Sequence, residues 1–393
     1  AGMNTDNLET RRIMAEEPTF QPFELERMLS KVENTVEYNL SESGAHPLSL
    51  RQLLGGSAMI EELLDTEFYY PQTNGILALR ENIAALYAGA TPANVLVTVG
   101  AAEANFISVQ ALTSPGDEVV VMLPNYMQIW GLAKNSGMEV RSFNLKEEQR
   151  WAPDLAELED AVSERTRFIA ICNPNNPTGY ILTEAEMDGI VAAASRVGAW
   201  ILADEVYSGA ERLTDTQTPS FWGRYDKVLA VGSLSKAYAL PGLRIGWVVA
   251  PEKMVDPLWA RHEYVTIDAT TLANKLAAHA LSPEVRPRIL QHVRDYVRRG
   301  FPVLEEWLQA QPGLFSLVPP QASAVAFVRY HLDLNSTALV EGLVEEKSVF
   351  IIPGDHFGLD HFFRISFGIP RQHLAPALAR IQEYLAERQV RQS

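Results

Sequence analysis

The sequence predicts an α/β protein with a large, mostly parallel sheet covered by helices and a second, smaller α+β domain. Its 393 residues exceed the size of one ordinary domain. Through the middle of the chain, short and continuously apolar runs alternate with helical patterns. This alternation is typical of βαβ units around a sheet that is buried on both faces. Toward the C-terminus the alternation stops, which indicates a different and smaller unit.

The large domain is expected to span residues 47–280. Its strands are predicted from runs in which almost every residue is apolar, such as Glu118-Val-Val-Val-Met-Leu123. The expected strands are residues 95–99, 118–123, 168–172, 200–203 and 228–231, and the expected helices include residues 102–112 and 184–196.

The smaller domain is expected to span residues 281–393, and residues 1–46 are expected to form an N-terminal arm that is part of it. Residues 18–46 are rich in proline and polar groups, and we expect them to wrap onto the small domain. The expected elements of the small domain are a helix at about 286–310, strands at 324–328, 349–352 and 362–366, and a final helix at about 371–388.

Charge and cysteine usage narrow the classes of function. The chain carries 33 Lys and Arg against 49 Asp and Glu, a net charge of −16. A surface this acidic repels phosphate backbones and anionic lipids, so we expect neither nucleic acid nor membrane as a partner. The one cysteine, Cys172, follows an apolar run, which indicates a buried, inert thiol. With no signal-peptide layout, no membrane-length apolar run and no metal-ligand spacing, we expect a cytoplasmic protein without a metal.

Chemistry is expected at the carboxyl ends of the strands, where ligands bind in open α/β sheets. The strand that ends near Val99 leads into a glycine turn and a helix start, whose free N–H groups can bind a phosphate. The next candidate is the rigid loop Asn173-Pro-Asn-Asn-Pro-Thr-Gly179, which offers three amide side chains. The third is Asp204 at an apolar strand end. Its carboxylate needs a cation or hydrogen bonds, and capping a helix is the alternative to a functional role.

Lys236 follows the strand that ends near Val231, in the run Ser233-Leu-Ser-Lys236. Burial beside an apolar strand lowers the pKa of a lysine and makes its amine nucleophilic. Arg244 comes eight residues later, after a Pro-Gly turn. A nucleophilic lysine together with an arginine that binds phosphate suits a phosphorylated aldehyde.

Together these motifs resemble those of the fold-type-I pyridoxal-phosphate enzymes, specifically the class I/II aminotransferase superfamily. The loop 173–179, the run Asp204-Glu-Val-Tyr207 and the Lys236–Arg244 spacing stand in the family's order. The resemblance implies an aspartate-aminotransferase-like fold with a sheet of the seven-stranded type, and pyridoxal 5′-phosphate as cofactor. It implies that Lys236 carries the cofactor as a Schiff base and moves the proton from the substrate.

The resemblance also implies a role for each residue around the cofactor ring. Asp204 is expected to pair with the pyridinium nitrogen, so that the ring can accept electrons. Tyr207 and Asn176 are expected to hydrogen-bond the phenolic oxygen, and Tyr126 is expected to stack on the ring.

Further residues are implied as ligands of the phosphate. The phosphate is expected to be bound by Ser233, Arg244 and the backbone amides of Ala101 and Ala102 of the same chain. The glycine turn lacks the serine or threonine that the family often has there. Tyr70 resembles the tyrosine that reaches the phosphate of the neighbouring subunit, which implies a homodimer with shared active sites.

Arg364, in Phe362-Phe-Arg-Ile-Ser366, matches the arginine that binds the substrate α-carboxylate. Asn176 and the backbone N–H of Gly44 are expected to assist it. The segment around Gly44 is similar to that of a branch near capreomycidine synthase, a cyclising pyridoxal enzyme of arginine-derived substrates. Glu42 in this segment is a candidate ligand for a cationic side chain, or a solvated or N-capping carboxylate. His46 is expected to be structural.

The leading interpretation is an aminotransferase for an L-α-amino acid and a 2-oxo acid. The alternative is a pyridoxal-phosphate lyase or cyclase, which performs a β- or γ-elimination, a replacement or a cyclisation. A regulatory domain that binds the cofactor without chemistry is disfavoured, because no basic helix-turn-helix pattern precedes Tyr38. The side-chain preference does not follow from the sequence.

Overall fold

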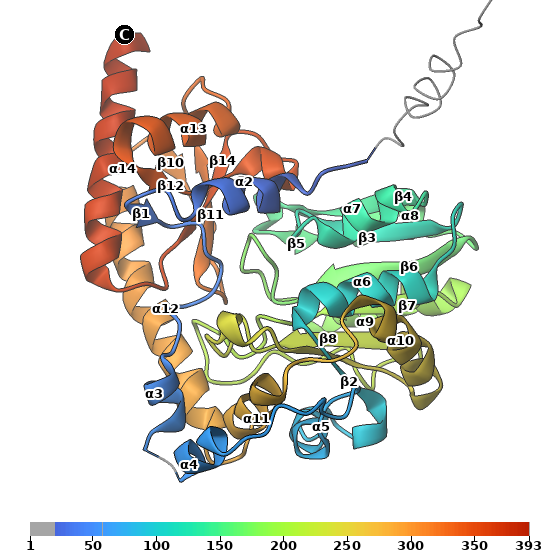
Figure 1. Cartoon of the computed structure of the whole chain (residues 1–393). Helices are drawn as coiled ribbons and strands as arrows, with labels where there is room; N and C mark the ends of the chain where they lie inside the picture. The colour runs from blue at the N-terminus through green and yellow to red at the C-terminus, as the bar shows by residue number, and fades with distance from the viewer. Residues whose placement is uncertain (1–19, 57, 393) are drawn as a thin grey trace, which may run out of the picture.

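The computed structural model describes residues 20–56 and 58–392. Our expectation for the first nineteen residues, that they hold no signal peptide, lies outside the described residues. Figure 1 shows a large domain around one twisted sheet, a smaller domain beside it, and a long helix that runs along both. Among the described residues, no helix is long and apolar enough to cross a membrane.

The large sheet confirms the predicted α/β class. Its strand order is β2-β9-β8-β7-β6-β3-β4-β5, so seven strands are extended at one edge by the two-residue β5. Strands β3, β4, β6, β7 and β8 are mutually parallel, whereas β9 runs antiparallel to β2 and β8. The strand bounds are β2 (Val95–Thr98), β3 (Glu118–Leu123), β4 (Glu139–Lys146), β5 (Ala152–Pro153), β6 (Thr166–Cys172), β7 (Trp200–Asp204), β8 (Val228–Ser233) and β9 (Gly246–Val249).

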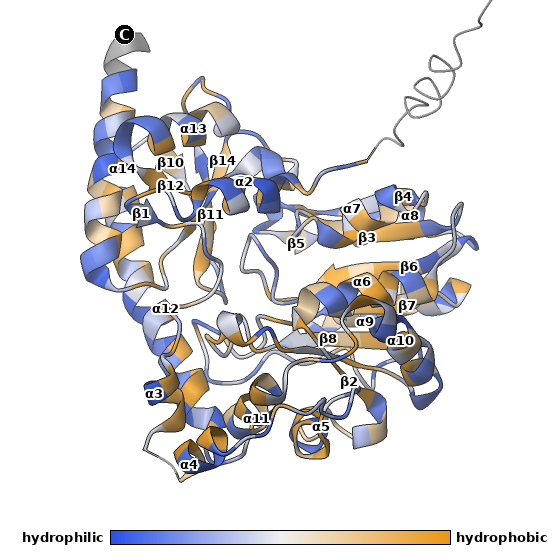
Figure 2. Cartoon of the chain, in the orientation of Figure 1, coloured by the Kyte–Doolittle hydropathy of each residue, from blue (hydrophilic) through white to orange (hydrophobic). Residues whose placement is uncertain are grey.

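Both faces of this sheet are buried, which explains the continuously apolar strands. Along β6, Phe168 and Ala170 join one hydrophobic cluster, while Ile169 and Ile171 join the other. Figure 2 shows β3, β6 and β7 as largely apolar. The helices on the first face are α6 (Gly100–Leu112), α7 (Gln128–Asn135) and α10 (Glu252–Val265), and those on the second face include α8 (Leu155–Ala161) and α9 (Glu184–Val197).

The small domain has an antiparallel sheet of order β10-β11-β14-β13. The N-terminal arm adds β1 (Tyr38–Asn39), which pairs in parallel with β12 (Val349–Phe350). The arm therefore packs onto the small domain, as its composition suggested, while the domain boundaries themselves stay a prediction. The other elements are β10 (Phe315–Ser316), β11 (Val325–Tyr330), β13 (Ile352–Pro353), β14 (Phe362–Ser366), α12 (Arg286–Gln309), α13 (Ser336–Lys347) and α14 (Arg371–Gln392).

Local sequence signals set several helix ends. Helix α9 begins at a capping box, in which Thr183 accepts a hydrogen bond from the backbone N–H of Glu186, and ends at Gly198 in the left-handed conformation. The remaining helices are α2 (Glu24–Val32), α3 (Leu50–Leu54), α4 (Met59–Leu64), α5 (Leu77–Ala84) and α11 (Thr271–Ala280).

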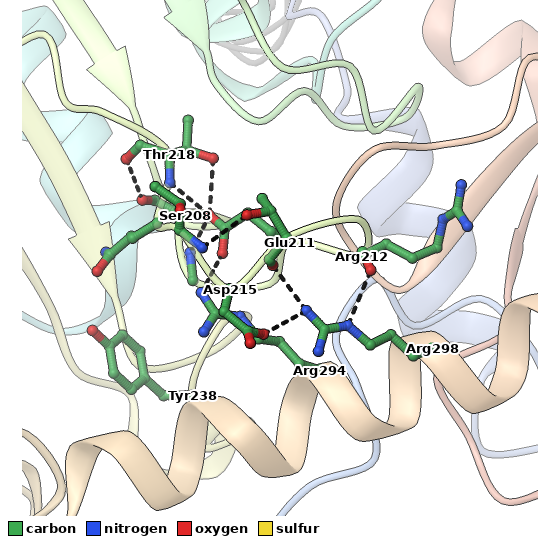
Figure 3. Close-up of polar contacts among 12 residues, drawn as sticks. Ser208, Glu211, Arg212, Asp215, Thr218, Tyr238, Arg294 and Arg298 are labelled. Atoms are coloured by element: carbon green, nitrogen blue, oxygen red, sulfur yellow. Dashed lines mark hydrogen bonds and ion pairs between the residues drawn. The ribbon is translucent and has the colours of Figure 1, made fainter.

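A buried ion pair ties the loop after β7 to the long helix α12 (Figure 3). Glu211 and Arg294 are both buried, and their charged groups lie 2.7 Å apart. Glu211 also accepts hydrogen bonds from the N–H of Gly209 and from the N–H and hydroxyl of Thr218. Because both oxygens of the Glu211 carboxylate have partners inside the protein, the pair ties α12 to the loop that follows β7.

Candidate active site

One cavity of about 470 Å³ lies where the carboxyl ends of β6, β7 and β8 face helix α2 and the small domain. Figure 1 shows α2 between the small domain and the large sheet. The cavity brings together ten of the twelve predicted site residues. They are Ala101, Ala102, Tyr126, Asn176, Asp204, Tyr207, Ser233, Lys236, Arg244 and Arg364.

Lys236 follows β8 and is half-buried in the wall of this cavity. Burial lowers the pKa of its amine, and the nearby cation of Arg364 lowers it further, while Glu42 raises it. Gly44 lies against the same residue: a Cβ there would come within 3.3 Å of the Ser235 carbonyl and 3.8 Å of the Lys236 Cδ. The lysine is thus packed by the N-terminal arm, and a larger fraction of its amine is neutral and nucleophilic than in water.

Asp204 ends β7 and is buried, with no salt bridge among the described residues. Its carboxylate accepts hydrogen bonds from the Asn105 amide, 3.2 Å away, and from the backbone N–H of Val206, 3.2 Å away. Burial raises the pKa of this carboxyl, and the Asn105 hydrogen bond opposes that shift. No described helix begins at Asp204, so it does not cap one. An uncompensated carboxylate here favours a cationic partner in the cavity.

Two tyrosines, Tyr126 and Tyr207, line the cavity together with Asn176. The Tyr207 hydroxyl donates to the Ser43 hydroxyl, 2.8 Å away, and burial raises its pKa. The Tyr126 hydroxyl donates to the Glu26 carboxylate, and its ring packs edge-on against Phe23. Both rings are therefore fixed by contacts with the N-terminal arm.

The start of α6 forms an anion site together with Arg244. Gly100 has φ +74°, and a Cβ there would lie 2.3 Å from the Arg244 Nη2 atom. Only glycine therefore allows the guanidinium to approach the free N–H groups of the helix start. Arg244 also donates to the Ser235 hydroxyl, 3.4 Å away, and the Ser233 hydroxyl accepts from the Ser235 N–H at 2.8 Å. The positive end of the α6 dipole, the Arg244 guanidinium and the hydroxyls of Ser233 and Ser235 together offer a site that a phosphate would fit.

Arg364 enters the cavity from β14 of the small domain and is only 2% exposed. It donates to the Asn176 amide oxygen at 3.1 Å and to the Ser41 carbonyl at 2.5 Å. Its Nε atom is buried without a hydrogen-bond partner among the described residues. A buried guanidinium with an unused N–H is suited to bind a carboxylate that enters the cavity.

Two predicted residues lie outside the cavity lining. Gly44 packs behind Lys236, as described above. Tyr70 is 81% exposed and does not line this cavity. A contact between Tyr70 and a phosphate site therefore requires a second copy of the chain, and it stays a prediction.

A family model for aminotransferases of class I and II matches residues 57–381. The chain belongs to this family. Its relatives include capreomycidine synthase of Streptomyces vinaceus, 32% identical over 88% of this chain and 89% of that one. Aspartate aminotransferase of Thermotoga maritima is 30% identical over 82% and 85%. A crystal structure of a pyridoxal-phosphate-dependent aminotransferase from Streptococcus suis superposes with a TM-score of 0.88, at 31% identity over 94% and 99% of the two chains.

The cofactor of this aminotransferase-family chain is pyridoxal 5′-phosphate, and the cavity fits it. The turn at Gly100 leaves space for an anion beside Arg244 that a Cβ would fill. Beside Asp204, the Asn105 amide oxygen is buried without a partner among the described residues. The donor set therefore matches a ligand with a phosphate at one end and a basic ring nitrogen at the other.

The structure adds cavity residues that we did not predict from the sequence. Asn105 lies one turn into α6, in the run after the glycine turn. An amide among the small and apolar residues of this run is the signal that could have drawn attention to it. Glu26 and Glu33 come from α2 and its C-terminal end, and nothing local in the sequence marks them. Cys172 also lines the cavity, but burial raises the pKa of its thiol, as expected for an inert side chain.

Proposed function

We propose that the chain is an aminotransferase that acts on an L-α-amino acid and a 2-oxo acid, with Lys236 as its catalytic lysine. The observation that carries the proposal is the meeting of Lys236 with Asp204, Arg244 and Arg364 in one cavity. Each of these residues comes from a different element. Together they offer one ligand for each functional group of a cofactor and an amino acid.

Bound pyridoxal phosphate supplies an electron sink for the bond that breaks at the substrate Cα. Lys236 would hold the cofactor covalently through its amine until the substrate amine takes its place, and the freed lysine amine would then take the proton from Cα and return it. Its lowered pKa suits both tasks, because the free amine is the base. Asp204 holds positive charge at the ring nitrogen, and Asn105 keeps the carboxylate oriented.

Arg364 binds the substrate α-carboxylate, with Asn176 and the Gly44 N–H beside it. Two fixed contacts on the carboxylate orient the Cα bonds toward Lys236. Tyr207 and Asn176 hydrogen-bond the phenolic oxygen, and Tyr126 packs against the ring. Proton transfer at Cα is then the step that these side chains position together.

The phosphate is held by Ser233, Arg244 and the amides of Ala101 and Ala102, with Tyr70 from the neighbouring subunit. We therefore propose a homodimer with shared active sites.

Domain limits at residues 46 and 280 are part of the proposal, supported by the end of α11 at Ala280. A cytoplasmic location is supported by the single, buried cysteine.

A second candidate is a lyase or cyclase of modified amino acids. The relative named capreomycidine synthase, which matches most of the chain, favours it. The same residues would remove the Cα proton in either reaction, and the difference lies in whether a leaving group departs afterwards.

The two reactions are separated by a test without any 2-oxo acid. Each amino acid is incubated with the enzyme, and the absorbance of the lysine-bound cofactor and the product are followed together. For an aminotransferase we expect about one equivalent of 2-oxo acid per site and then no further turnover. Continued release of ammonia or of a cyclic product would establish the lyase or cyclase instead. Lys236→Ala is the control, which should form neither.

A further inference from the structure

Three carboxylates line the cavity on the side of the N-terminal arm: Glu26, Glu33 and Glu42. Glu26 is held by the Tyr126 hydroxyl. Glu33 and Glu42 have no ion pair and no side-chain hydrogen bond among the residues that the structure describes. Glu42 does not cap a helix, and it is exposed while it lines the cavity, so its position fits both a solvated carboxylate and a ligand for a cationic side chain.

These carboxylates lie close enough to repel one another. Burial raises the pKa of Glu33, and the charges of Glu42 and Glu26 raise it further. Glu42 also raises the pKa of both Lys236 and Arg364. The negative charges therefore face the same space as the substrate-binding residues.

The cations of the cavity do not neutralise them once cofactor and substrate are bound. Arg244 would be matched by the phosphate and Arg364 by the α-carboxylate, while the amine of Lys236, released from the cofactor by the substrate amine, would be the neutral base. Asp204 is matched by the ring nitrogen. Glu26 is matched only by the neutral Tyr126 hydroxyl, and Glu33 and Glu42 have no partner among the described residues, so a cation from the substrate would supply the opposite charge.

The wall that leads to these carboxylates is apolar. Phe23, Leu25 and Leu29 of the α2 segment line the cavity beside Glu26 and Glu33. An apolar wall that ends in carboxylates is complementary to a chain of methylene groups that ends in a cation.

We propose that the substrate is an L-amino acid whose side chain is an aliphatic stem with a terminal ammonium or guanidinium, bound by Glu33 and Glu42. This inference deepens the proposed function and rests on it. The α-carboxylate lies on Arg364, the stem passes along Phe23 and Leu29, and the cation lies at the carboxylates of the arm.

The test titrates the holoenzyme with pairs of amino acids that differ in the terminal charge. Lysine is compared with norleucine, and arginine with citrulline. The readouts are the absorbance change of the lysine-bound cofactor and the binding heat measured by calorimetry. We expect each cationic member to bind about tenfold more tightly or better, the size of a charge-assisted contact. The preference should weaken with added salt, because Glu42 is exposed at the cavity mouth.

Glu33→Gln and Glu42→Gln should each reduce this preference without weakening norleucine. Glu24→Gln is the matched control, since Glu24 is exposed at the start of α2, the helix that Glu33 caps, and does not line the cavity. Equal binding of the neutral members, or an unchanged preference in both variants, would overturn the inference while the spectral response still supports the proposed function. If no amino acid changed the absorbance, the proposed function itself would fail, and the inference with it.

Discussion

At the scale of single residues, Asp204 and its neighbour Glu205 show how one strand end gives two carboxylates different environments. Asp204 lines the main cavity, whereas Glu205 lines a second cavity of about 230 Å³, together with Tyr87 and Trp247. Glu205 accepts a hydrogen bond from the backbone N–H of Phe221 at 2.8 Å. Burial raises its pKa from 4.5 to about 7. Because Glu205 has no part in the proposed chemistry, its protonation is best followed through stability.

Glu205 is predicted to make the protein less stable as the pH rises. Because its pKa is raised in the folded state, the folded protein holds a proton that the unfolded chain loses at lower pH. The stabilisation is complete below about pH 4.5 and is lost as the pH rises through about 7. The stability of Glu205→Gln has no such dependence on pH. The thermal midpoint of the variant, relative to that of the wild type, should therefore be higher at pH 8 than at pH 5 by a few degrees. Calorimetry at both pH values tests this, with Glu24→Gln controlling for the lost charge. A difference that does not change with pH would contradict it.

At the scale of elements, the first turn of α6 joins the sheet to the phosphate site. Gly246 of β9 also lies close, since a Cβ there would come within 2.4 Å of the Gly100 carbonyl carbon. The turn is therefore confined between β9 and Arg244. Its glycines permit close packing that any side chain would prevent.

Gly100→Ala is predicted to weaken cofactor binding. The added Cβ would push Arg244 out of place, and it would also strain a backbone with φ +74°. We expect the dissociation constant of pyridoxal phosphate, measured by absorbance titration, to rise about tenfold or more. Gly116→Ala carries the same kind of strain, with φ +88° but nothing within 4 Å, and should lose stability only. Equal cofactor affinity in the two variants would show that the clash with Arg244 is harmless.

The sequence predicted those elements whose residues are buried on both sides. β3 and β14 have the bounds that we expected, and the apolar runs at β6, β7 and β8 were found within a few residues. β4 was missed because only three of its eight residues are apolar, and β9 because it is a four-residue strand that begins with a glycine. Helix α2 was missed as well, since its fold depends on contacts such as Glu26 with Tyr126, 100 positions apart.

At the scale of the whole molecule, the site is assembled from segments that lie far apart in the chain. Arg364 of the small domain reaches Asn176 of the large one, and Ser41 of the arm accepts from the same guanidinium. Family motifs gave the cofactor side of the cavity, because those residues stand at strand ends in a fixed order. The substrate side depends on where the arm lies across both domains, which no local pattern encodes.

The outer surface near residue 70 carries large exposed apolar side chains. Phe68, Tyr69 and Tyr70 are all exposed, and so are Tyr264 and Ile267. His262 of α10 contacts the Thr73 carbonyl at 2.9 Å, which ties this segment to the helix. Such a patch favours burial against a partner, and a second copy with two-fold symmetry would bring Tyr70 to the other cavity. In solution we expect a species of twice the 43.7 kDa chain mass, measured by sedimentation.

Hybrid dimers test whether Tyr70 acts across the two subunits. Tyr70→Phe removes the hydroxyl that would donate to the partner's phosphate, so its cofactor should dissociate faster. An excess of Lys236→Ala chains should restore the slow rate, because they supply Tyr70 to the pocket of the Tyr70→Phe chain. In such a hybrid, only the pocket of the Tyr70→Phe chain retains Lys236. The absorbance of the lysine-bound cofactor therefore reports on that pocket alone. Chains with both substitutions are the control and should not restore the rate. No rescue by Lys236→Ala would contradict the action of Tyr70 across the subunits. Rescue by the control chains would contradict it as well, because those chains carry no Tyr70 to supply.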